Sequence, residues 1–348
     1  MIAFGYPPME MRAVERIPDG ANWQYEPKWD GFRCLAFRDG GEIALQSKAG
    51  QPLGRYFPEI VAALAQLPQR QFILDGELVV PIAGALSFDA LQQRIHPAAS
   101  RVAMLARTTP AWYLAFDLLA LEGAELVAQP LAERRAVLET VARDFDGATL
   151  RLSPATRDRA VVDQWFARVG GALDGVIAKR ADAAYASGTR DAAVKVKRQR
   201  SADCVIGGYR LAKGDAGVVG SLLLGLYDEA GLLDYVGFCS AFPAAERAAL
   251  LDRLGPLVGE PGFTGGAPDS GPSRWNRDAE RDRSYVKLRH ELVLEVGFDQ
   301  VTGGRIRHGT RPLRWRTDKA PRQCTFDQLA TPDNAVRLLG EGRTGEVS

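Results

Sequence analysis

The chain changes character near residue 201, and this change constrains more than any other feature what its 348 residues can fold into. Up to residue 200, apolar runs typical of strands alternate with segments in which apolar residues recur at helical spacing. Beyond it, short β-rich runs are separated by turns. A chain of this length also exceeds the usual size of one domain. The sequence therefore predicts an α+β protein of two domains: residues 1–200, which mix strands and helices, and residues 201–348, which form a small β-barrel.

Local patterns predict individual elements of the first domain. Two strand-like runs flank the turn R-D-G-G-E and predict a β-hairpin over residues 32–47. Ser87 is expected to cap a short helix that carries Leu91 and Ile95. The other predicted elements are helices over 57–64 and 131–145 and strands over 71–80, 112–121, 174–179 and 193–197.

The second domain carries one predicted helix among its strands, over residues 244–254. The stretch 259–273 is rich in Gly, Pro and Ser, a composition that predicts a flexible surface loop.

Composition excludes several classes of protein. No run of eighteen apolar residues is present, so a membrane span is excluded, and the N-terminus lacks the pattern of a signal peptide. The protein is therefore predicted to be cytoplasmic. Four cysteines and three histidines are scattered along the chain, which argues against a structural zinc site and against disulfides. Any chemistry is expected to depend on lysine, arginine and carboxylate side chains.

A net charge of only +1 conceals two basic tracts. Residues 179–213 contain nine Lys/Arg against three Asp, and residues 274–322 contain thirteen Lys/Arg against seven Asp/Glu. The rest of the chain is correspondingly acidic. Localised positive charge on an acidic body is typical of a protein that binds a polyanion, although solvated strand faces would give the same composition.

The nine residues Y-E-P-K-W-D-G-F-R, at 25–33, place a lysine beside a proline, with a carboxylate, a glycine and an arginine close by. A D-G pair usually marks a turn, so this stretch alone is equally well explained by a solvated turn. No G-x-x-x-x-G-K-[S/T] occurs, which excludes a phosphate-binding P-loop. Six further short motifs follow in order: L-Q-S-K-A-G (45–50), L-D-G-E-L (74–78), F-D-L-L (116–119), L-D-G-V-I-A-K (173–179), A-V-K-V-K (193–197) and R-W-R-T-D-K (314–319).

Together these collinear motifs resemble those of the covalent nucleotidyltransferases, which include ATP-dependent DNA ligases, RNA ligases and mRNA capping enzymes. Three positions differ from the usual pattern: Lys48 replaces an arginine, Asp174 replaces a glutamate, and Ala193 stands where tryptophan is common. The whole chain is most similar to stand-alone bacterial ATP-dependent DNA ligases of the short ligase C group. The resemblance implies a nucleotidyltransferase (adenylation) domain at 1–200, followed by an OB-fold β-barrel domain at 201–348.

Lys28 is the nucleophile that this resemblance implies. It would attack the α-phosphorus of ATP to form a lysyl-AMP phosphoramidate and release pyrophosphate. A free lysine has a pKa of about 10.4, so a shift of about three units, or roughly 4 kcal/mol, is needed for reaction at neutral pH. Burial and nearby cations act in the required direction. Arg33, Lys179, Lys195 and Lys197 are the candidate cations, together with a bound metal.

Lys195 and Lys197 alternate with Val194 and Val196. On a strand, this period of two places both lysines on one face and both valines in the core. Two ammonium groups about 7 Å apart would then straddle the α-phosphate. A strand with one solvated face has the same local pattern, and the resemblance is what favours a phosphate site.

Roles at the nucleotide follow from the resemblance alone. Glu26 would help to read the adenine amino group, Phe116 would stack on the base, and Glu77 would contact the ribose or a metal. Arg33 would bridge ribose and phosphate. Asp174 is the expected ligand of Mg²⁺, directly or through water, because Mg²⁺ prefers hard carboxylate oxygens.

Roles at the nucleic acid and in the second domain follow in the same way. Lys48 would face the 5′-phosphate side of a nick as a point charge, since lysine cannot grip phosphate as arginine does. Asp30 would lie near the 3′ terminus. Arg316 and Lys319 would orient pyrophosphate for departure, a task of positioning and charge neutralisation, and Arg314 would share this role or contact nucleic acid. Asp75 and Asp117, by contrast, are expected to be structural.

The predicted function is ATP-dependent DNA ligation, with ATP and Mg²⁺ or Mn²⁺ as cofactors and nicked duplex DNA as partner. The protein is expected to act as a monomer in DNA repair; the sequence does not identify the pathway, protein partners or preferred metal. RNA ligation or RNA capping is the alternative, since both would use Lys28. A further alternative is a nucleic-acid-binding protein that kept this fold and lost catalysis.

Overall fold

The computed structural model describes residues 2–82, 84–167, 173–197, 200–212, 214–268, 284–307, 309–330 and 338. The chain divides into two compact units, Met1–Arg198 with Thr331–Ser348, and Gln199–Ala330. Parts of three predictions lie outside the described residues: the end of the loop at 259–273, parts of both basic tracts, and the second domain beyond residue 330 except Leu338. Leu338 is buried in a core of the first unit. The sequence had assigned residues 201–348 to the second domain. No described helix is long and apolar enough to span a membrane.

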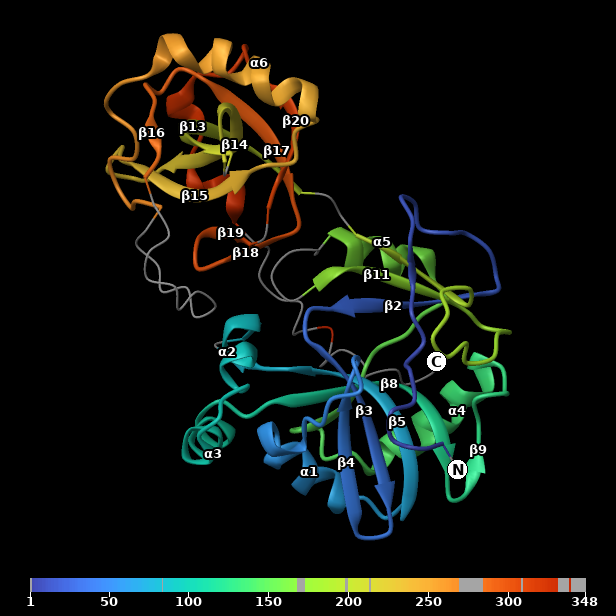
Figure 1. Ribbon diagram of the computed structural model, residues 1–348. Helices are drawn as coiled ribbons and strands as arrows, with labels where there is room; N and C mark the ends of the chain where they lie inside the picture. Colours follow the sequence, from blue (N-terminus) through green and yellow to red (C-terminus); the bar gives the residue numbers. More distant parts are fainter. Residues whose placement is uncertain are drawn as a thin grey trace. The chain divides into compact units, whose positions relative to one another are not determined.

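The larger sheet of the first unit has the order β10-β8-β5-β3-β4. β5 and β8 are buried along almost their whole length because elements cover both faces, which explains their near-continuous apolar sequences. α1 lies beside β4 and α4 lies beside β8 (Figure 1). The elements of this layer are β3 (Phe32–Asp39), β4 (Glu42–Ser47), η1 (Gly54–Tyr56), α1 (Pro58–Ala65), β5 (Gln71–Val79), β6 (Pro81–Ile82), β7 (Ala85–Leu86), α2 (Phe88–Gln93), α3 (Ala99–Thr108), β8 (Trp112–Leu121), β9 (Ala124–Glu125), α4 (Leu131–Val141), η2 (Ala142–Asp144) and β10 (Leu150–Leu152).

The smaller sheet of the first unit has the order β1-β12-β11-β2. Its strands are β1 (Arg12–Ala13), β2 (Trp23–Trp29), β11 (Leu173–Arg180) and β12 (Ala193–Val196), and α5 (Arg159–Ala167) packs against β11 and β2. The register places Lys28 opposite Gly175 and Lys195 opposite Ile177. Strands far apart in the sequence therefore bring the lysine motifs together.

Gly175 makes this close pairing possible. Its φ is +153°, a conformation that other residues rarely adopt, and a Cβ at this position would lie 2.1 Å from the carbonyl oxygen of Val196. The glycine of the motif at 173–179 is thus required by the approach of β11 to β12.

Most local predictions for the first unit are confirmed. β3 and β4 form the expected hairpin, and the Ser87 hydroxyl accepts a hydrogen bond from the N–H of Ala90 at the start of α2. The helix predicted over 131–145 ends earlier, at Val141, and continues as the 3₁₀ turn η2. The sequence did not predict α3 or α5, because few of their residues are buried and their apolar stripes are narrow.

The main sheet of the second unit has the order β15-β14-β13-β17-β20, with β16 paired to β13, and β18 and β19 form a small second sheet. An isolated bridge joins Cys239, at the end of β15, to Thr310, just before β20, so the two edge strands approach each other without forming a closed barrel among the described residues. This is the partly open arrangement of an OB-fold. The predicted helix is confirmed as α6 (Ala244–Leu254), which packs along β14 (Figure 1).

The remaining elements of the second unit are β13 (Arg200–Ala212), β14 (Asp215–Tyr227), β15 (Leu233–Cys239), η3 (Gly255–Leu257), β16 (Val286–Lys287), β17 (Val293–Phe298), β18 (Gln300–Thr302), β19 (Arg305–Arg307), β20 (Arg311–Trp315), η4 (Pro321–Gln323) and η5 (Phe326–Leu329). All four cysteines are buried free thiols, in agreement with the absence of a disulfide pattern.

Candidate active site

A cavity of about 320 Å³ in the first unit gathers most of the residues that the sequence singled out. Its walls come from β2, β3, β5, β8, β11 and β12, with the N-terminal segment on one side. The predicted residues that line it are Glu26, Lys28, Arg33, Lys48, Glu77, Phe116, Lys179 and Lys195.

Lys28 is held at this cavity by a single carboxylate. Its ammonium donates to Asp174 Oδ2 at 2.5 Å, and the Lys197 ammonium lies 3.1 Å from the same oxygen. Burial acts to raise the pKa of Asp174, but the charges of Lys28 and Lys197 outweigh it and hold the pKa below its usual value. Asp174 is therefore ionised near neutral pH. It contacts both Lys28, in the motif at 25–33, and Lys197, in the motif at 193–197.

Lys195, on β12, has the predicted orientation, and Lys197 directly follows the strand. Val194 and Val196 are buried in the core, while Lys195 is partly exposed and lines the cavity. Burial lowers the pKa of Lys195, and the positive charges of Lys28 and Lys197 lower it further. Several cations thus converge on one wall, which suits an anionic group such as a phosphate.

An aromatic ring also lines the cavity. The ring of Phe116 lines it, with the Arg33 guanidinium 4.6 Å and the Lys179 ammonium 4.5 Å from the ring centroid. Glu26 is almost fully buried, and both of its carboxylate oxygens have protein partners: Lys179 at 2.7 Å and the Gln24 amide at 2.9 Å. The side chain of Glu26 is therefore held in place by protein contacts on both of its oxygens.

Arg33 is fixed by a fully buried carboxylate. It donates from Nε and Nη2 to the two oxygens of Asp75, each at 2.5 Å, and the Tyr185 hydroxyl donates to Asp75 at 2.6 Å. Burial acts to lower the pKa of Arg33, but Asp75 outweighs it and raises the pKa well above the usual value. Asp117 is likewise buried, in a bidentate pair with Arg134. Both aspartates therefore have the structural role that the sequence suggested.

Glu77 is the group of the cavity that titrates closest to neutral pH. It lies on β5 directly across from Arg33. Burial raises its pKa to about 7, against the opposing charges of Arg33 and Lys28, and Asp30 adds to the rise.

The donor set for a metal is limited to oxygen. Among the described residues, no group of three or more His, Cys, Asp or Glu side chains is arranged to hold an ion. Asp174 and Glu77 nevertheless offer carboxylates at the cavity, the donor type that Mg²⁺ prefers, and phosphate or water oxygens would have to complete its shell. The residues present thus fit a metal that is shared with a bound polyphosphate.

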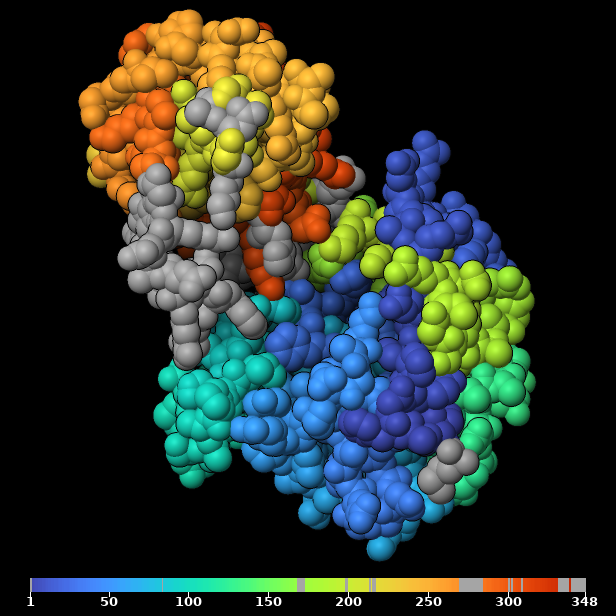
Figure 2. Space-filling model, in the orientation of Figure 1, coloured from blue at the N-terminus to red at the C-terminus, as the bar shows by residue number. Residues whose placement is uncertain are grey.

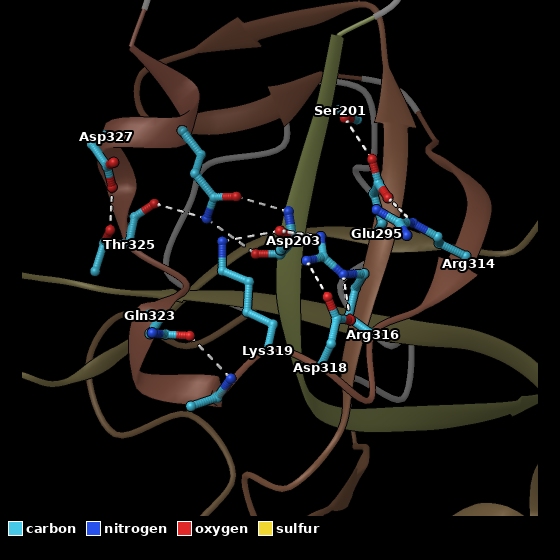
Figure 3. A network of polar contacts seen from close by, with 12 residues as sticks. Ser201, Asp203, Glu295, Arg314, Arg316, Asp318, Lys319, Gln323, Thr325 and Asp327 are labelled. Atoms are coloured by element: carbon cyan, nitrogen blue, oxygen red, sulfur yellow. Dashed lines mark hydrogen bonds and ion pairs between the residues drawn. The ribbon is translucent and has the colours of Figure 1, made fainter.

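The second unit carries a separate cluster of charged residues. Arg316 and Lys319 both contact Asp203, on β13, and Arg316 also pairs with Asp318 (Figure 3). Arg314 pairs instead with Glu295, at 2.6 Å. The structure thus brings Arg316 and Lys319 together and directs Arg314 to a different partner.

Comparison with known proteins decides the family. A family model described as ATP dependent DNA ligase domain matches residues 9–197, and one described as ATP dependent DNA ligase C terminal region matches residues 215–319. The chain belongs to the ATP-dependent DNA ligases.

Two curated relatives resemble this ligase along nearly their whole length. DNA ligase C2 of Mycolicibacterium smegmatis is 49% identical over 343 residues, covering 94% of this chain and 95% of the relative. DNA ligase C of Mycobacterium tuberculosis is 46% identical over 342 residues, covering 93% and 94%. A solved structure from a study of Lig E DNA ligases aligns with TM-score 0.54 at 18% identity, over 88% of this chain and 98% of that chain, and supports the fold alone. The chain is thus an ATP-dependent DNA ligase that resembles the mycobacterial ligase C proteins along nearly their whole length.

Some residues of the ligase cavity were not predicted. Residues 8–11 line it, and Glu10 pairs with Lys48 at 3.1 Å and with Arg190 at 2.9 Å. The N-terminal segment reaches this place because Met9 bridges to Ser187; Figure 2 shows it in dark blue against the yellow-green segment around residues 180–190. No short motif marks Glu10 or Arg190, so the sequence offered no signal for them.

Proposed function

We propose that this ligase seals nicks in duplex DNA through an AMP group carried covalently by Lys28. The observation that supports this most is the position of Lys28, at a cavity that combines converging cations with an aromatic wall. In the first step the Lys28 nitrogen bonds to the α-phosphorus of ATP, the bond to the β-phosphate oxygen breaks, and pyrophosphate leaves. Lys28 must be an uncharged amine to attack, so the ammonium that contacts Asp174 has to release a proton to solvent before this step.

The two later steps move the AMP group and then expel it. An oxygen of the 5′-phosphate attacks the same phosphorus, the P–N bond to Lys28 breaks, and Lys28 regains a proton. The 3′-hydroxyl then attacks the 5′-phosphate, the phosphodiester forms, and AMP leaves. Lys195 and Lys197 would neutralise the phosphate oxygens throughout, because phosphoryl transfer depends mainly on positioning and on charge.

The other predicted site residues keep their proposed roles. Phe116 would stack on the base, Glu26 would recognise it through its backbone, and Arg33 would reach ribose and phosphate. Lys48 and Asp30 would face the nick, and Arg314 would contact nucleic acid once it leaves Glu295. Arg316 and Lys319 would bind the pyrophosphate group. Glu77 and Lys179, which also line the cavity, would contact the nucleotide as well.

A Mg²⁺ ion, or Mn²⁺, would be held by Asp174 and Glu77 with phosphate oxygens. When bound, it would neutralise charge on the triphosphate. The ligase is further proposed to act as a cytoplasmic monomer in DNA repair, which gel filtration of the purified protein and its fractionation from cells would test. The repair pathway and its protein partners are left open.

The experiment that tests this function uses ATP and GTP labelled at the α-phosphate. Label from ATP is expected to attach covalently to the wild type and to chase into sealed DNA when nicked duplex is added. Lys28→Ala should take up no label. Lys287→Ala is the matched control, because Lys287 is an exposed lysine that pairs with Glu260 in the second unit. Label from GTP alone, or transfer to RNA alone, would favour a capping enzyme or an RNA ligase, and no label at all would favour a non-catalytic binding protein.

A further inference from the structure

A single carboxylate of the second unit engages two cations at once. Arg316 Nη1 lies 2.8 Å from both oxygens of Asp203, and the Lys319 ammonium lies 3.0 Å from one of them. The remaining edge of the guanidinium, Nε and Nη2, donates to Asp318 at 2.8 and 2.9 Å (Figure 3). All three nitrogens of Arg316 are therefore committed to protein carboxylates.

The charges of this cluster cancel. Arg316 and Lys319 contribute two positive charges, and Asp203 and Asp318 contribute two negative charges. A neutral cluster with its donors engaged exerts little pull on a polyphosphate. At least one of the two carboxylates must separate from its cation before Arg316 and Lys319 can bind a polyphosphate.

Asp203 is the fixed member of the cluster. It lies within β13 and is 7% exposed, and Gln328 holds its backbone by accepting from the N–H at 2.9 Å and donating to the C=O at 3.2 Å. The side chain of Asp318, by contrast, is 63% exposed and lies only two residues from Arg316 in the sequence. The cations must therefore move away from Asp203, since Asp203 cannot follow them.

We propose that Asp203 is a latch: it holds Arg316 and Lys319 while no polyphosphate is bound, and it competes with the pyrophosphate end of ATP for them. This inference rests on the proposed role of Arg316 and Lys319 at that group. The exchange gives the two cations a new anion but leaves the buried Asp203 carboxylate without its cations, and this unpaired charge draws them back. Once pyrophosphate departs, the cations return to Asp203, which weakens product binding and clears them from the reaction site.

The test is the variant Asp203→Asn, which removes one negative charge and keeps the shape of the side chain. The KM for ATP in Lys28 adenylation should fall about fivefold, equivalent to about 1 kcal/mol, with an unchanged rate at saturating ATP. Inhibition by added pyrophosphate should strengthen by a similar factor. Sealing of a nick that already carries AMP should not change, because that substrate bypasses ATP. Asp203→Glu, which restores the charge, should return both constants toward the wild type.

Glu291→Gln is the matched control. It makes the same change in net charge within the same unit, at an exposed pair with Arg289. The KM for ATP and the inhibition by pyrophosphate should both stay at the wild-type values. An equal fall in KM in this control would show a general charge effect and would overturn the latch.

The outcomes separate this proposal from the proposed function. A wild type that forms no lysyl-AMP would refute the function itself. If the wild type forms lysyl-AMP but Asp203→Asn has an unchanged or higher KM for ATP, the latch is refuted and the proposed function is not. Circular dichroism checks folding, and Asp203→Ser replaces the first variant if it unfolds. If neither folds, Asp203 is a structural anchor and the latch is wrong.

Discussion

Replacing Gly175 by alanine should damage stability and catalysis together. The added methyl group would lie 2.1 Å from the carbonyl oxygen of Val196, 3.0 Å from its carbonyl carbon and 3.1 Å from the Cα of Lys197. All three atoms are backbone, so no side chain can turn aside. Relief requires β11 and β12 to separate by about an ångström, against a normal contact distance of about 3.5 Å.

The expected cost can be estimated from two contributions. A non-glycine residue at φ +153° costs about 1–3 kcal/mol, and a lost ladder hydrogen bond costs about 1 kcal/mol. Together they predict destabilisation by about 3 kcal/mol, or a fall in Tm of about 6–12 °C for a unit of this size. Because Asp174 precedes Gly175 and Lys197 follows the clash, the contacts around Lys28 would move as well. Adenylation should therefore slow by more than about tenfold, since small displacements of reacting groups are costly.

Calorimetry and adenylation by labelled ATP measure the two effects. Gly54→Ala is the matched control, because a methyl group there would meet only Val61, at an ordinary 3.7 Å. It should leave Tm and the adenylation rate close to the wild type. A Gly175→Ala protein with both quantities unchanged would refute the argument that this glycine sets the spacing of the site.

Three further perturbations test other parts of the account. The pKa of Glu77 is raised from 4.5 to about 7 in the folded state, so ionisation of Glu77 destabilises the folded state. This loss of folding stability is absent below about pH 4.5, grows as the pH rises toward 7, and is constant above that pH. The Tm of Glu77→Gln relative to the wild type should therefore increase across that window, and a flat difference would contradict the raised pKa. Asp75→Asn should destabilise the protein by about 3–5 kcal/mol in urea unfolding, because it leaves the Arg33 charge uncompensated; Tyr185→Phe removes two hydrogen bonds, one to Asp75 and one from the Met9 N–H, and should cost only about 2 kcal/mol, so equal costs would count against the ion pair. Nick sealing should weaken steeply between about 50 and 200 mM salt if basic residues clamp the DNA backbone, whereas a flat dependence would argue against such a clamp.

Parts of the site could be predicted from local sequence wherever the neighbours of a residue along the chain determine its burial and its backbone conformation. The alternation of Val194 and Val196 with lysines was enough to orient β12, and the turn R-D-G-G-E was enough to define the β3–β4 hairpin. The change in sequence character near residue 201 lies close to the point where the chain passes from the first compact unit to the second. Patterns of this kind persist because burial and backbone conformation act on consecutive residues.

Partners that come from distant segments could not be predicted in this way. Nothing near Asp203 in the sequence indicates that it meets Arg316 and Lys319, more than a hundred residues later. Glu10 reaches Lys48 and Arg190 only because the N-terminal segment crosses the sheet. Such pairs depend on the tertiary fold, which hydrophobic periodicity does not specify.

The most direct test of the central claim is the mass of the protein after incubation with ATP and Mg²⁺, followed by peptide mapping. The account predicts that one AMP is added and that it resides on Lys28, in the peptide containing K-W-D-G-F-R. Addition of nicked DNA should remove it. An adduct on Lys195 or another lysine, or an unmodified wild type, would contradict the assignment of Lys28 as the nucleophile.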